Sequence, residues 1–242
     1  MTTKSDETAM KPVCLVTGVG PEGGTGAEIA RRFAKEYDVA MLARNVANIE
    51  DLAGKYGAKA YSCDVGDLDA LVETMDRIKT EIGPPKIVIH NALRSTRGPL
   101  LEQDPMDLER NFRVNTTALL YMAQHCIPGM LEAGGGAILV TGNTSATRGK
   151  ANWGFFASTK AAQRILSESI AREFGPQGIH VAYFMIDAAI NTPRTRPIMG
   201  ADKPDEYFAE PHAIAEEMFR VAHQHRSTWS FMVDLRPFGE VW

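Results

Sequence analysis

The sequence predicts an α/β domain in which a parallel sheet is covered by helices on both faces. Short apolar runs suited to strands alternate along the chain with segments whose apolar residues recur at helical spacing. The strand segments are apolar at successive positions, so both faces of each strand would be buried, as in a parallel sheet between two helical layers. A glycine-rich turn between the first strand and the first helix is the third observation.

The first strand spans residues 13–16, and the helix after it carries apolar residues on one face from Ala27 to Phe33. The turn between them holds five glycines, at positions 18, 20, 23, 24 and 26. A turn without bulky side chains lets a pyrophosphate approach the backbone at the helix N-terminus, where unpaired N–H groups favour negative charge. The alternative is a flexible loop before an ordinary core helix.

Six further strands are expected, at residues 38–43, 58–63, 86–90, 137–141, 179–185 and 229–235. The helices between them are expected at 46–56, 68–82, 105–131, 152–174 and 211–225. The sequence Gly83-Pro84-Pro85 ends the second of these helices, and Pro128 should bend the third.

The chain of 242 residues is long enough to bury one large core, which predicts a single domain over residues 1–242. Residues 1–11 read as a loose polar leader rather than a signal sequence. The proline-containing segment 191–210 is the one long irregular insertion expected, either a mobile substrate loop or a static surface loop.

Charge and cysteine content exclude several classes of function. A net charge of −4 argues against a nucleic-acid or membrane-surface partner, because both usually require a basic face. No apolar stretch is long enough to span a bilayer, so a cytoplasmic protein is expected. Three widely spaced cysteines suggest neither a disulfide framework nor a metal site.

Ligands of such a sheet bind outside the carboxyl ends of its strands. Arg44 follows the second strand, where an arginine suits a ribose 2′-phosphate and a carboxylate would suit a free 2′-hydroxyl. We therefore expect NADP(H) to be preferred, with NAD(H) still possible as cofactor; the alternative is a solvated arginine at a helix start. Asp64 follows the third strand and is placed either to accept a hydrogen bond from an adenine amino group or to cap the next helix.

These motifs resemble those of the short-chain dehydrogenase/reductase family over nearly the whole chain. The glycine turn of that family matches Thr17-Gly18 and Gly24-Thr25-Gly26, and its motif after the fourth strand matches His90-Asn91-Ala92-Leu93. Asn115 matches its helix asparagine, and residues 156–160 match its Tyr-x-x-x-Lys pair. The resemblance implies a Rossmann-type, doubly wound sheet of seven strands in the order 3-2-1-4-5-6-7. It also implies a nicotinamide cofactor and a homodimer or homotetramer, and it places Ile190 and Thr192 beside the carboxamide.

Two of the four catalytic positions that the resemblance implies carry other residues here. Phe156 stands at the position of the tyrosine, and Asn143 falls at the position of the serine, whereas Asn115 and Lys160 are retained. Phenylalanine has no titratable proton, so Phe156 cannot act as a general acid or base. Lys160 lies one helical turn from Phe156 and could transfer a proton only if burial depressed its pKa. Other hydroxyl and amino groups near the expected site, each more simply structural, are Thr144, Ser145, Lys150 and Tyr183.

Six basic residues follow the fourth, fifth and sixth strands: Arg94, Arg97, Arg148, Lys150, Arg194 and Arg196. They suggest an anionic substrate, or alternatively solvated loops with one arginine on the cofactor. The loop after the sixth strand departs from the family pattern at Ile186-Asp187, where Asp187 would either face the nicotinamide or form a turn.

The sequence therefore predicts an atypical NADP(H)-dependent oxidoreductase that transfers a hydride to or from a small organic substrate. Iminium ions and conjugated alkenes accept hydride without a simultaneous proton, so they suit Phe156 better than a simple ketone does. Two alternatives remain open: a cofactor-binding protein with little or no turnover that serves as a sensor or subunit, and a non-redox enzyme that reuses the cleft.

Overall fold

A parallel seven-stranded sheet forms the centre of the structure, a computed structural model that describes residues 11–200 and 202–239. Its strands are β1 (Val13–Thr17), β2 (Asp38–Ala43), β3 (Lys59–Ser62), β4 (Pro85–His90), β5 (Gly136–Asn143), β6 (Ile179–Ile186) and β9 (Met232–Leu235). They lie in the order β3-β2-β1-β4-β5-β6-β9, which confirms the expected topology with β9 as the seventh strand. Of the leader expected over residues 1–11, all but Lys11 lies outside the described residues.

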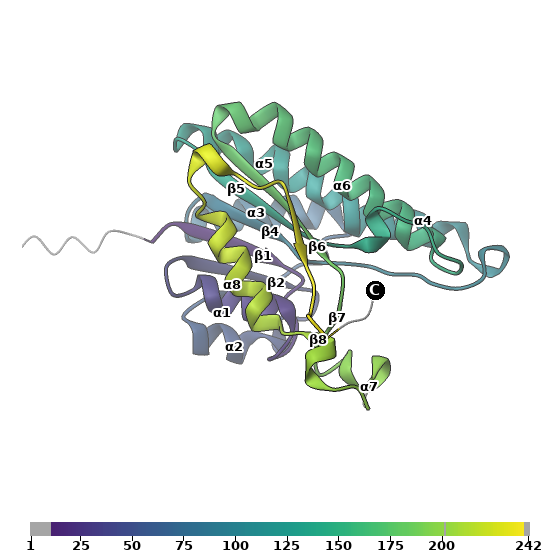
Figure 1. Ribbon diagram of the computed structural model, residues 1–242. Helices are drawn as coiled ribbons and strands as arrows, with labels where there is room; N and C mark the ends of the chain where they lie inside the picture. Colours follow the sequence, from purple (N-terminus) through teal and green to yellow (C-terminus); the bar gives the residue numbers. More distant parts are fainter. Residues whose placement is uncertain (1–10, 201, 240–242) are drawn as a thin grey trace, which may run out of the picture.

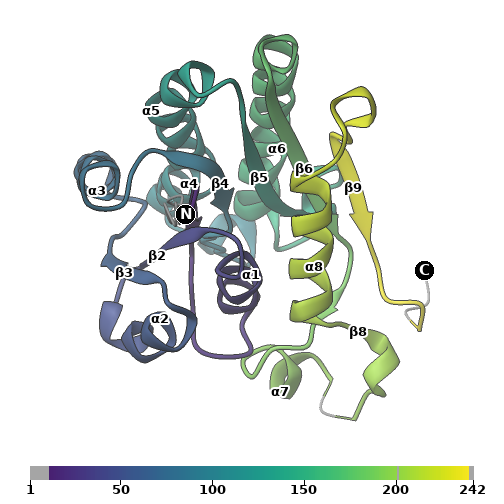
Figure 2. The same ribbon diagram turned by 90° about the vertical axis from the view of Figure 1, so that its left-hand side faces the viewer.

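Helices cover both faces of this sheet (Figures 1 and 2). They are α1 (Thr25–Phe33), α2 (Glu50–Tyr56), α3 (Leu68–Glu81), α4 (Pro105–Phe112), α5 (Ala118–Glu132), α6 (Gly154–Phe174), α7 (Arg196–Met199) and α8 (Pro211–Ala222). Helices α1, α2 and α8 bury one apolar layer against the sheet, and α3, α5 and α6 bury the other. Short 3-10 turns occupy Val46–Asn48, Leu100–Glu102, Thr144–Ala146, Gly175–Gln177, Asp205–Tyr207 and Arg226–Thr228.

The helical segment expected over residues 105–131 is divided by a π-helical turn. Helix α4 ends at Phe112, the turn spans Arg113–Thr117, and α5 then continues through Pro128 to Glu132. The helical hydrogen bonding is therefore irregular at 113–117, and the bend near Pro128, which lies inside α5, stays a prediction. A π-turn widens the helix locally and is frequent at functional sites, and this one contains the fully buried Asn115.

The segment expected to be irregular over residues 191–210 contains regular structure. Strand β7 (Ala189–Ile190) pairs in parallel with β8 (Phe208–Ala209), and helix α7, which lies between them in the sequence, is seen below the pair in Figure 1. The two ends of the segment are therefore fixed to each other beside the carboxyl end of β6.

Three further features concern the cysteines, the helices and the possible metal ligands of the described residues. Cys14, Cys63 and Cys126 are free thiols in the two apolar layers. In the described part of the chain, no helix is long and apolar enough to cross a bilayer. Within the same residues, no group of His, Cys, Asp or Glu side chains has the arrangement of a metal site.

Candidate functional site

The glycine turn packs tightly against the end of β4. Gly18 has a φ of +68°, and a β-carbon there would lie 2.5 Å from the Ala92 Cα. A β-carbon at Gly26 would lie 2.6 Å from the Gly18 carbonyl oxygen, and that oxygen also accepts a hydrogen bond of 3.0 Å from the Asn91 Nδ2. Gly20, in contrast, faces open space. The turn is therefore closely packed at Gly18 and Gly26 and open at Gly20.

Thr17 joins the carboxyl ends of β1 and β4. Its hydroxyl oxygen accepts hydrogen bonds of 3.2 Å from the backbone N–H groups of Asn91 and Ala92. The Thr141 hydroxyl of β5 donates to the Asn91 Oδ1 at 3.2 Å. Three neighbouring strand ends are thus held in one arrangement by Thr141 together with Thr17, Asn91 and Ala92, of which the last three are the ones that the family resemblance assigns to cofactor binding.

Helix α1 begins at Thr25 with an N-terminus that no side chain caps. Gly24 is its N-cap residue, and it has no side chain to accept from the first N–H groups. Those groups and the helix dipole suit a bound phosphate. Pro193 covers the other side of the turn, since a β-carbon at Gly23 would lie 3.5 Å from the Pro193 ring. The turn therefore lies between β4 and the segment that contains α7.

Arg44 and Asp64 lie at the ends of β2 and β3, as the sequence predicts. The Arg44 side chain is exposed and has no ion-pair partner among residues 11–200 and 202–239. Asp64 is also exposed, and its Oδ1 accepts from the Gly66 N–H at 2.9 Å. Asp67, not Asp64, caps helix α3. The structure thus removes helix capping as the alternative role for Asp64 and leaves the Arg44 guanidinium accessible.

Lys160 lies in the interior, not in an open cleft. It is 1% exposed, and its Nζ donates to the Thr141 carbonyl oxygen at 2.9 Å and to the Gln163 side-chain oxygen. Burial lowers the pKa of Lys160 to about 7. Lys160 is therefore held by the protein itself at the point where the resemblance expects it to contact the nicotinamide ribose.

Gln163 connects Lys160 to the π-turn. Its Nε2 donates to the Asn115 carbonyl oxygen at 2.5 Å. The His90 Nε2 lies 3.3 Å from the same oxygen, and its Nδ1 lies 3.3 Å from the Thr17 hydroxyl. Burial, and then the charge of Lys160, lower the pKa of His90 to about 3, so this histidine is neutral at ordinary pH.

The Asn115 side chain positions the loop that follows β4. Its Oδ1 accepts from the Arg94 N–H and its Nδ2 donates to the Arg94 carbonyl oxygen, both at 2.9 Å. The same Nδ2 donates to the Thr159 hydroxyl at 2.9 Å, which ties the π-turn to α6. Asn115 thus fixes three segments around the candidate site.

Phe156, near the start of α6, neighbours the Trp153 ring and the Arg97 guanidinium. The Phe156 ring is 2% exposed, and its centroid is 5.9 Å from that of Trp153. The Arg97 guanidinium lies 3.7 Å from the Trp153 ring centroid and 5.9 Å from that of Phe156. Position 156 is therefore apolar and bordered by one cation.

Asn143 is the last residue of β5, and Tyr183 lies within the neighbouring strand β6. The Asn143 Oδ1 accepts from the Ser145 N–H at 3.0 Å and so caps the turn after β5. The Tyr183 ring packs directly against Gly142, where a β-carbon would lie 2.1 Å from it, and the side chain is fully buried. Burial raises the pKa of Tyr183, so this phenol is a packed core group and not an exposed replacement acid.

The segment after β6 is fixed by its own contacts. Asp187 forms ion pairs with Arg236 at 2.8 Å and with Arg148 at 3.8 Å. Ile190 lies in β7, and the Thr192 hydroxyl oxygen accepts from the Thr195 N–H at 3.0 Å. Asp187 is therefore an ion-paired carboxylate, a role that the sequence did not indicate.

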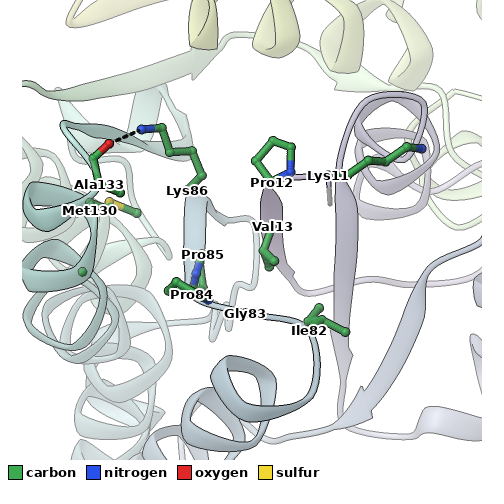
Figure 3. Close-up of a pocket in the computed structure, with 11 residues that line it drawn as sticks. Lys11, Pro12, Val13, Ile82, Gly83, Pro84, Pro85, Lys86, Met130 and Ala133 are labelled. Carbon is green, nitrogen blue, oxygen red and sulfur yellow. Dashed lines mark hydrogen bonds between the residues drawn. The ribbon is translucent and has the colours of Figure 1, made fainter. Parts of the chain in front are cut away.

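A separate hollow of about 230 Å³ lies at the amino ends of β1 and β4 (Figure 3). Val13, Pro84 and Met130 line it, and the Lys86 Nζ donates to the Ala133 carbonyl oxygen at its border at 3.3 Å. The glycine turn lies at the carboxyl ends of the strands, and this hollow lies at their amino ends, so it is not part of the candidate site.

Sequence reasoning missed Gln163, Trp153 and Pro193. Gln163 lies three residues after Lys160, so helical spacing places it on the same face, but its bond to Asn115 joins residues far apart in the chain. The contacts of Trp153 with Arg97 and of Pro193 with Gly23 also join residues far apart in the chain.

Comparison with known proteins gives consistent matches. A family model described as short chain dehydrogenase matches residues 12–200. An uncharacterized short-chain type dehydrogenase/reductase of Sinorhizobium fredii is 31% identical over 176 residues, which cover 69% of this chain and 70% of that protein. The L-xylulose reductase of Mesocricetus auratus is 29% identical over 169 residues, which cover 69% of this chain and 67% of that protein.

A similar solved structure is that of a metagenomic short-chain oxidoreductase in complex with NADP. It superposes with a TM-score of 0.80 and 22% identity, covering 93% of this chain and 97% of that one. At that identity the likeness concerns the fold alone.

Proposed function

From the premise that this chain belongs to the short-chain dehydrogenase family, we propose that it is an NADP(H)-dependent oxidoreductase with an altered active site. Its substrate is a small organic molecule whose C=O, C=N or activated C=C bond accepts hydride, or whose reduced form donates it. No tyrosine acid takes part, because position 156 is phenylalanine.

The glycine turn carries this proposal. Gly18 and Gly26 are fixed against the end of β4, and the N-terminus of α1 is left without a side-chain cap. An uncapped helix N-terminus beside a close-packed glycine turn suits a pyrophosphate. The backbone of Gly24, Thr25 and Gly26 would bind it, with Thr17, Asn91 and Ala92 holding the turn in place.

Residues after the carboxyl ends of other strands would make the remaining contacts with the cofactor. Arg44 would bind a ribose 2′-phosphate through charge-assisted hydrogen bonds. Asp64 would accept from the adenine amino group, and Ile190 and Thr192 would border the carboxamide. When bound, the cofactor supplies or accepts the hydride. NADP complexes of similar folds, such as the metagenomic oxidoreductase, agree with a nicotinamide cofactor.

The protonation step distinguishes this site. Loss of a positioned general acid typically costs about two to four decades of rate. Burial lowers the pKa of Lys160 to about 7, which meets the condition for proton transfer, but its Nζ is buried and donates to Thr141 and Gln163, so we do not assign the general-acid role to it. Asn143 would orient the substrate by hydrogen bonding, and Asn115 would maintain the loop after β4. Substrates that need no proton at the moment of hydride transfer, such as iminium ions and conjugated alkenes, are therefore favoured over ketones.

A second candidate function is a cofactor sensor with little turnover. The observation that favours it is the same burial of Lys160, whose Nζ is hydrogen-bonded to Thr141 and Gln163, while position 156 itself carries no titratable group. Under either function, the family resemblance also favours a homodimer or homotetramer, which light scattering after size-exclusion chromatography measures.

The test begins with calorimetric titration of NADPH and NADH. Turnover is then followed by NADPH oxidation with matched ketone, enone and imine substrates, for the parent and for Phe156→Tyr. The oxidoreductase proposal predicts NADPH binding and a preference for the imine or enone, with ketone reduction rising in Phe156→Tyr. Binding without turnover on any of the three classes favours the sensor, and absence of NADPH binding contradicts both.

A further inference from the structure

A cation without a carboxylate partner lies beside position 156. Three of the six basic residues expected at the candidate site form ion pairs: Arg94 with Asp107, Arg148 with Asp187, and Arg196 with Asp205. Arg97 forms no ion pair with any residue of the described ranges 11–200 and 202–239. Its positive charge is therefore not neutralised by a neighbour. The anionic substrate that the six residues together suggest stays a prediction.

The Arg97 guanidinium is held against an aromatic ring that borders Phe156. Its central carbon lies 3.7 Å from the Trp153 ring centroid, and its Nε donates to the Ser95 Oγ at 3.0 Å. The same carbon lies 5.9 Å from the Phe156 ring centroid, and the two ring centroids are also 5.9 Å apart. A guanidinium that stacks on an aromatic face keeps N–H groups at its edge available to an acceptor.

Backbone hydrogen bonds and packing fix the loop of Arg97 to the start of α6. The Gly98 N–H donates to the Asn152 carbonyl oxygen at 2.9 Å, and the Gly98 carbonyl oxygen accepts from the Gln103 Nε2 at 2.5 Å. A β-carbon at Gly154 would lie 3.6 Å from the Leu100 Cδ1. The place of the cation relative to residue 156 is thus set by several contacts and not by the stacking alone.

A fixed cation distinguishes the two kinds of substrate that tolerate Phe156. An iminium ion is positively charged and becomes neutral when it accepts hydride, so a neighbouring cation disfavours its binding. A conjugated enone is neutral and gains negative charge on its oxygen during the same step. A cation beside that oxygen stabilises the transition state more than the bound substrate, which is the condition for faster reaction.

The reaction of an enone balances without a protein acid. Hydride from the reduced nicotinamide forms a C–H bond at the C=C carbon farther from the carbonyl. The C=C electron pair moves toward the carbonyl carbon and the C=O pair moves onto oxygen, which gives an enolate. Water then protonates the remaining carbon of the former double bond. The enone, NADPH and one proton thus become the saturated ketone and NADP⁺.

We propose that Arg97 stabilises the negative charge that develops on the substrate oxygen, and that the substrate is an α,β-unsaturated carbonyl compound. This inference rests on the proposed function, because it places the reacting bond beside position 156. The guanidinium does not give up a proton at any ordinary pH, so its role is electrostatic. It supplies charge at a position where Phe156 supplies neither charge nor proton.

A binding experiment tests the oxyanion contact without turnover. The probe is 4-nitrophenol, whose phenolate resembles an enolate and whose two protonation states have different absorption spectra. Adding the protein with saturating NADP⁺, or without it, at a pH equal to the pKa of the free probe should increase the phenolate fraction. We expect the phenolate to bind about tenfold more tightly than the phenol, since a hydrogen bond to a charged group is stronger than a neutral one. Arg97→Gln should remove this preference, and Arg97→Lys should retain most of it.

Turnover of two substrates of opposite charge behaviour tests the catalytic role. NADPH oxidation is followed with 2-cyclohexen-1-one and with the permanently cationic N-methyl-3,4-dihydroisoquinolinium. Arg97→Gln should lower kcat/KM for the enone by about tenfold or more and raise it for the iminium by about threefold. Changes of opposite sign do not arise from a general loss of structure, and circular dichroism melting verifies the folding of each variant.

Two further variants complete the comparison. Arg97→Lys keeps the charge, so it should recover at least part of the enone activity that Arg97→Gln loses. Arg172→Gln is the matched control, since it removes the same charge near the far end of α6, where Arg172 pairs with Glu168. It should leave kcat/KM for both substrates unchanged.

The outcomes separate this inference from the proposed function. Equal losses on both substrates in Arg97→Gln, or a parent protein that prefers the iminium, overturn the role of Arg97 while the oxidoreductase proposal still stands. A phenolate preference that persists in Arg97→Gln also overturns it. Failure to bind NADPH contradicts the proposed function, and the 4-nitrophenol titration without cofactor then still decides whether Arg97 binds an oxyanion.

Discussion

The Lys160 ammonium donates a hydrogen bond to the side-chain oxygen of Gln163 in the interior of the protein. The partner is a neutral amide, so the cation gains hydrogen bonds without a neighbouring negative charge. Desolvation therefore dominates, and it lowers the pKa of Lys160 to about 7.

This burial makes stability depend on pH. The folded state releases the Lys160 proton near pH 7, whereas the unfolded chain keeps it to about pH 10.4. Between these values the unfolded state binds more protons, so the free energy of unfolding rises with pH. We expect a gain of about 1.5 kcal/mol from pH 7 to 8.5, measured by urea unfolding, with the slope largely abolished in Lys160→Met.

Lys150→Met is the control for that slope, because residue 150 lies on an exposed loop. The pH range stops at 8.5 because the buried Cys14 and Cys126 have raised pKa values and favour the opposite trend at higher pH. If the free energy of unfolding rose equally with pH in the parent and in Lys160→Met, Lys160 would not titrate as described.

Gln163→Met should destabilise the protein by about 2–5 kcal/mol. The substitution keeps the length of the side chain but removes an acceptor from Lys160 and a donor from the Asn115 carbonyl. Urea unfolding at pH 8 measures the loss. Gln177→Met, at an exposed glutamine that also donates to a backbone carbonyl, should cost less than about 1 kcal/mol. Equal losses in the two variants would contradict a special role for Gln163.

Gly18→Ala should cost about 2–4 kcal/mol and abolish NADPH binding. The φ of +68° is strained for alanine, and its methyl group would meet the Ala92 backbone at 2.5 Å. Gly20→Ala is the matched control in the same turn, because its methyl group would face open space. Thermal melting and NADPH titration of both variants give the comparison, and a tolerated alanine at position 18 would refute the close packing.

Arg44→Ala should weaken NADPH binding by about tenfold or more and change NADH binding less than twofold. Only NADPH carries the 2′-phosphate, and a hydrogen bond to a charged group contributes about 1.5–3 kcal/mol. Arg172→Ala, at an exposed arginine near the end of α6 that pairs with Glu168, should leave both affinities unchanged. Equal weakening of NADPH and NADH would mean that Arg44 does not recognise the 2′-phosphate.

Local sequence patterns were sufficient to predict the elements whose structure depends on residues close in the sequence. The apolar run at residues 13–16 and the glycines after it predict β1, the turn and α1, because burial and steric freedom there depend on neighbouring residues. The order of the strands came from the family resemblance, since hydrophobic periodicity does not specify which strands pair.

The contacts that define the site depend on tertiary structure. The π-turn around Asn115 forms where Thr159 of α6 meets it, and the stacking of Arg97 on Trp153 joins two loops. Asp187 pairs with Arg236, which lies 49 residues later in the chain. No local sequence pattern encodes contacts between residues so far apart in the chain. The role of a residue such as Gln163 is therefore seen only once the helices are packed.

The short pairing of β7 with β8 has an evolutionary consequence. Ala189–Ile190 and Phe208–Ala209 form paired strands at the two ends of residues 191–207. The segment is therefore a loop whose ends stay together whatever its length. Doubling the length of such a loop raises the entropic free energy of closing it by only about 0.6 kcal/mol. Under the proposed function, in which this segment borders the substrate, insertions, deletions or a grafted sequence from a relative would alter substrate selectivity while β1, the glycine turn and α1 are inherited intact.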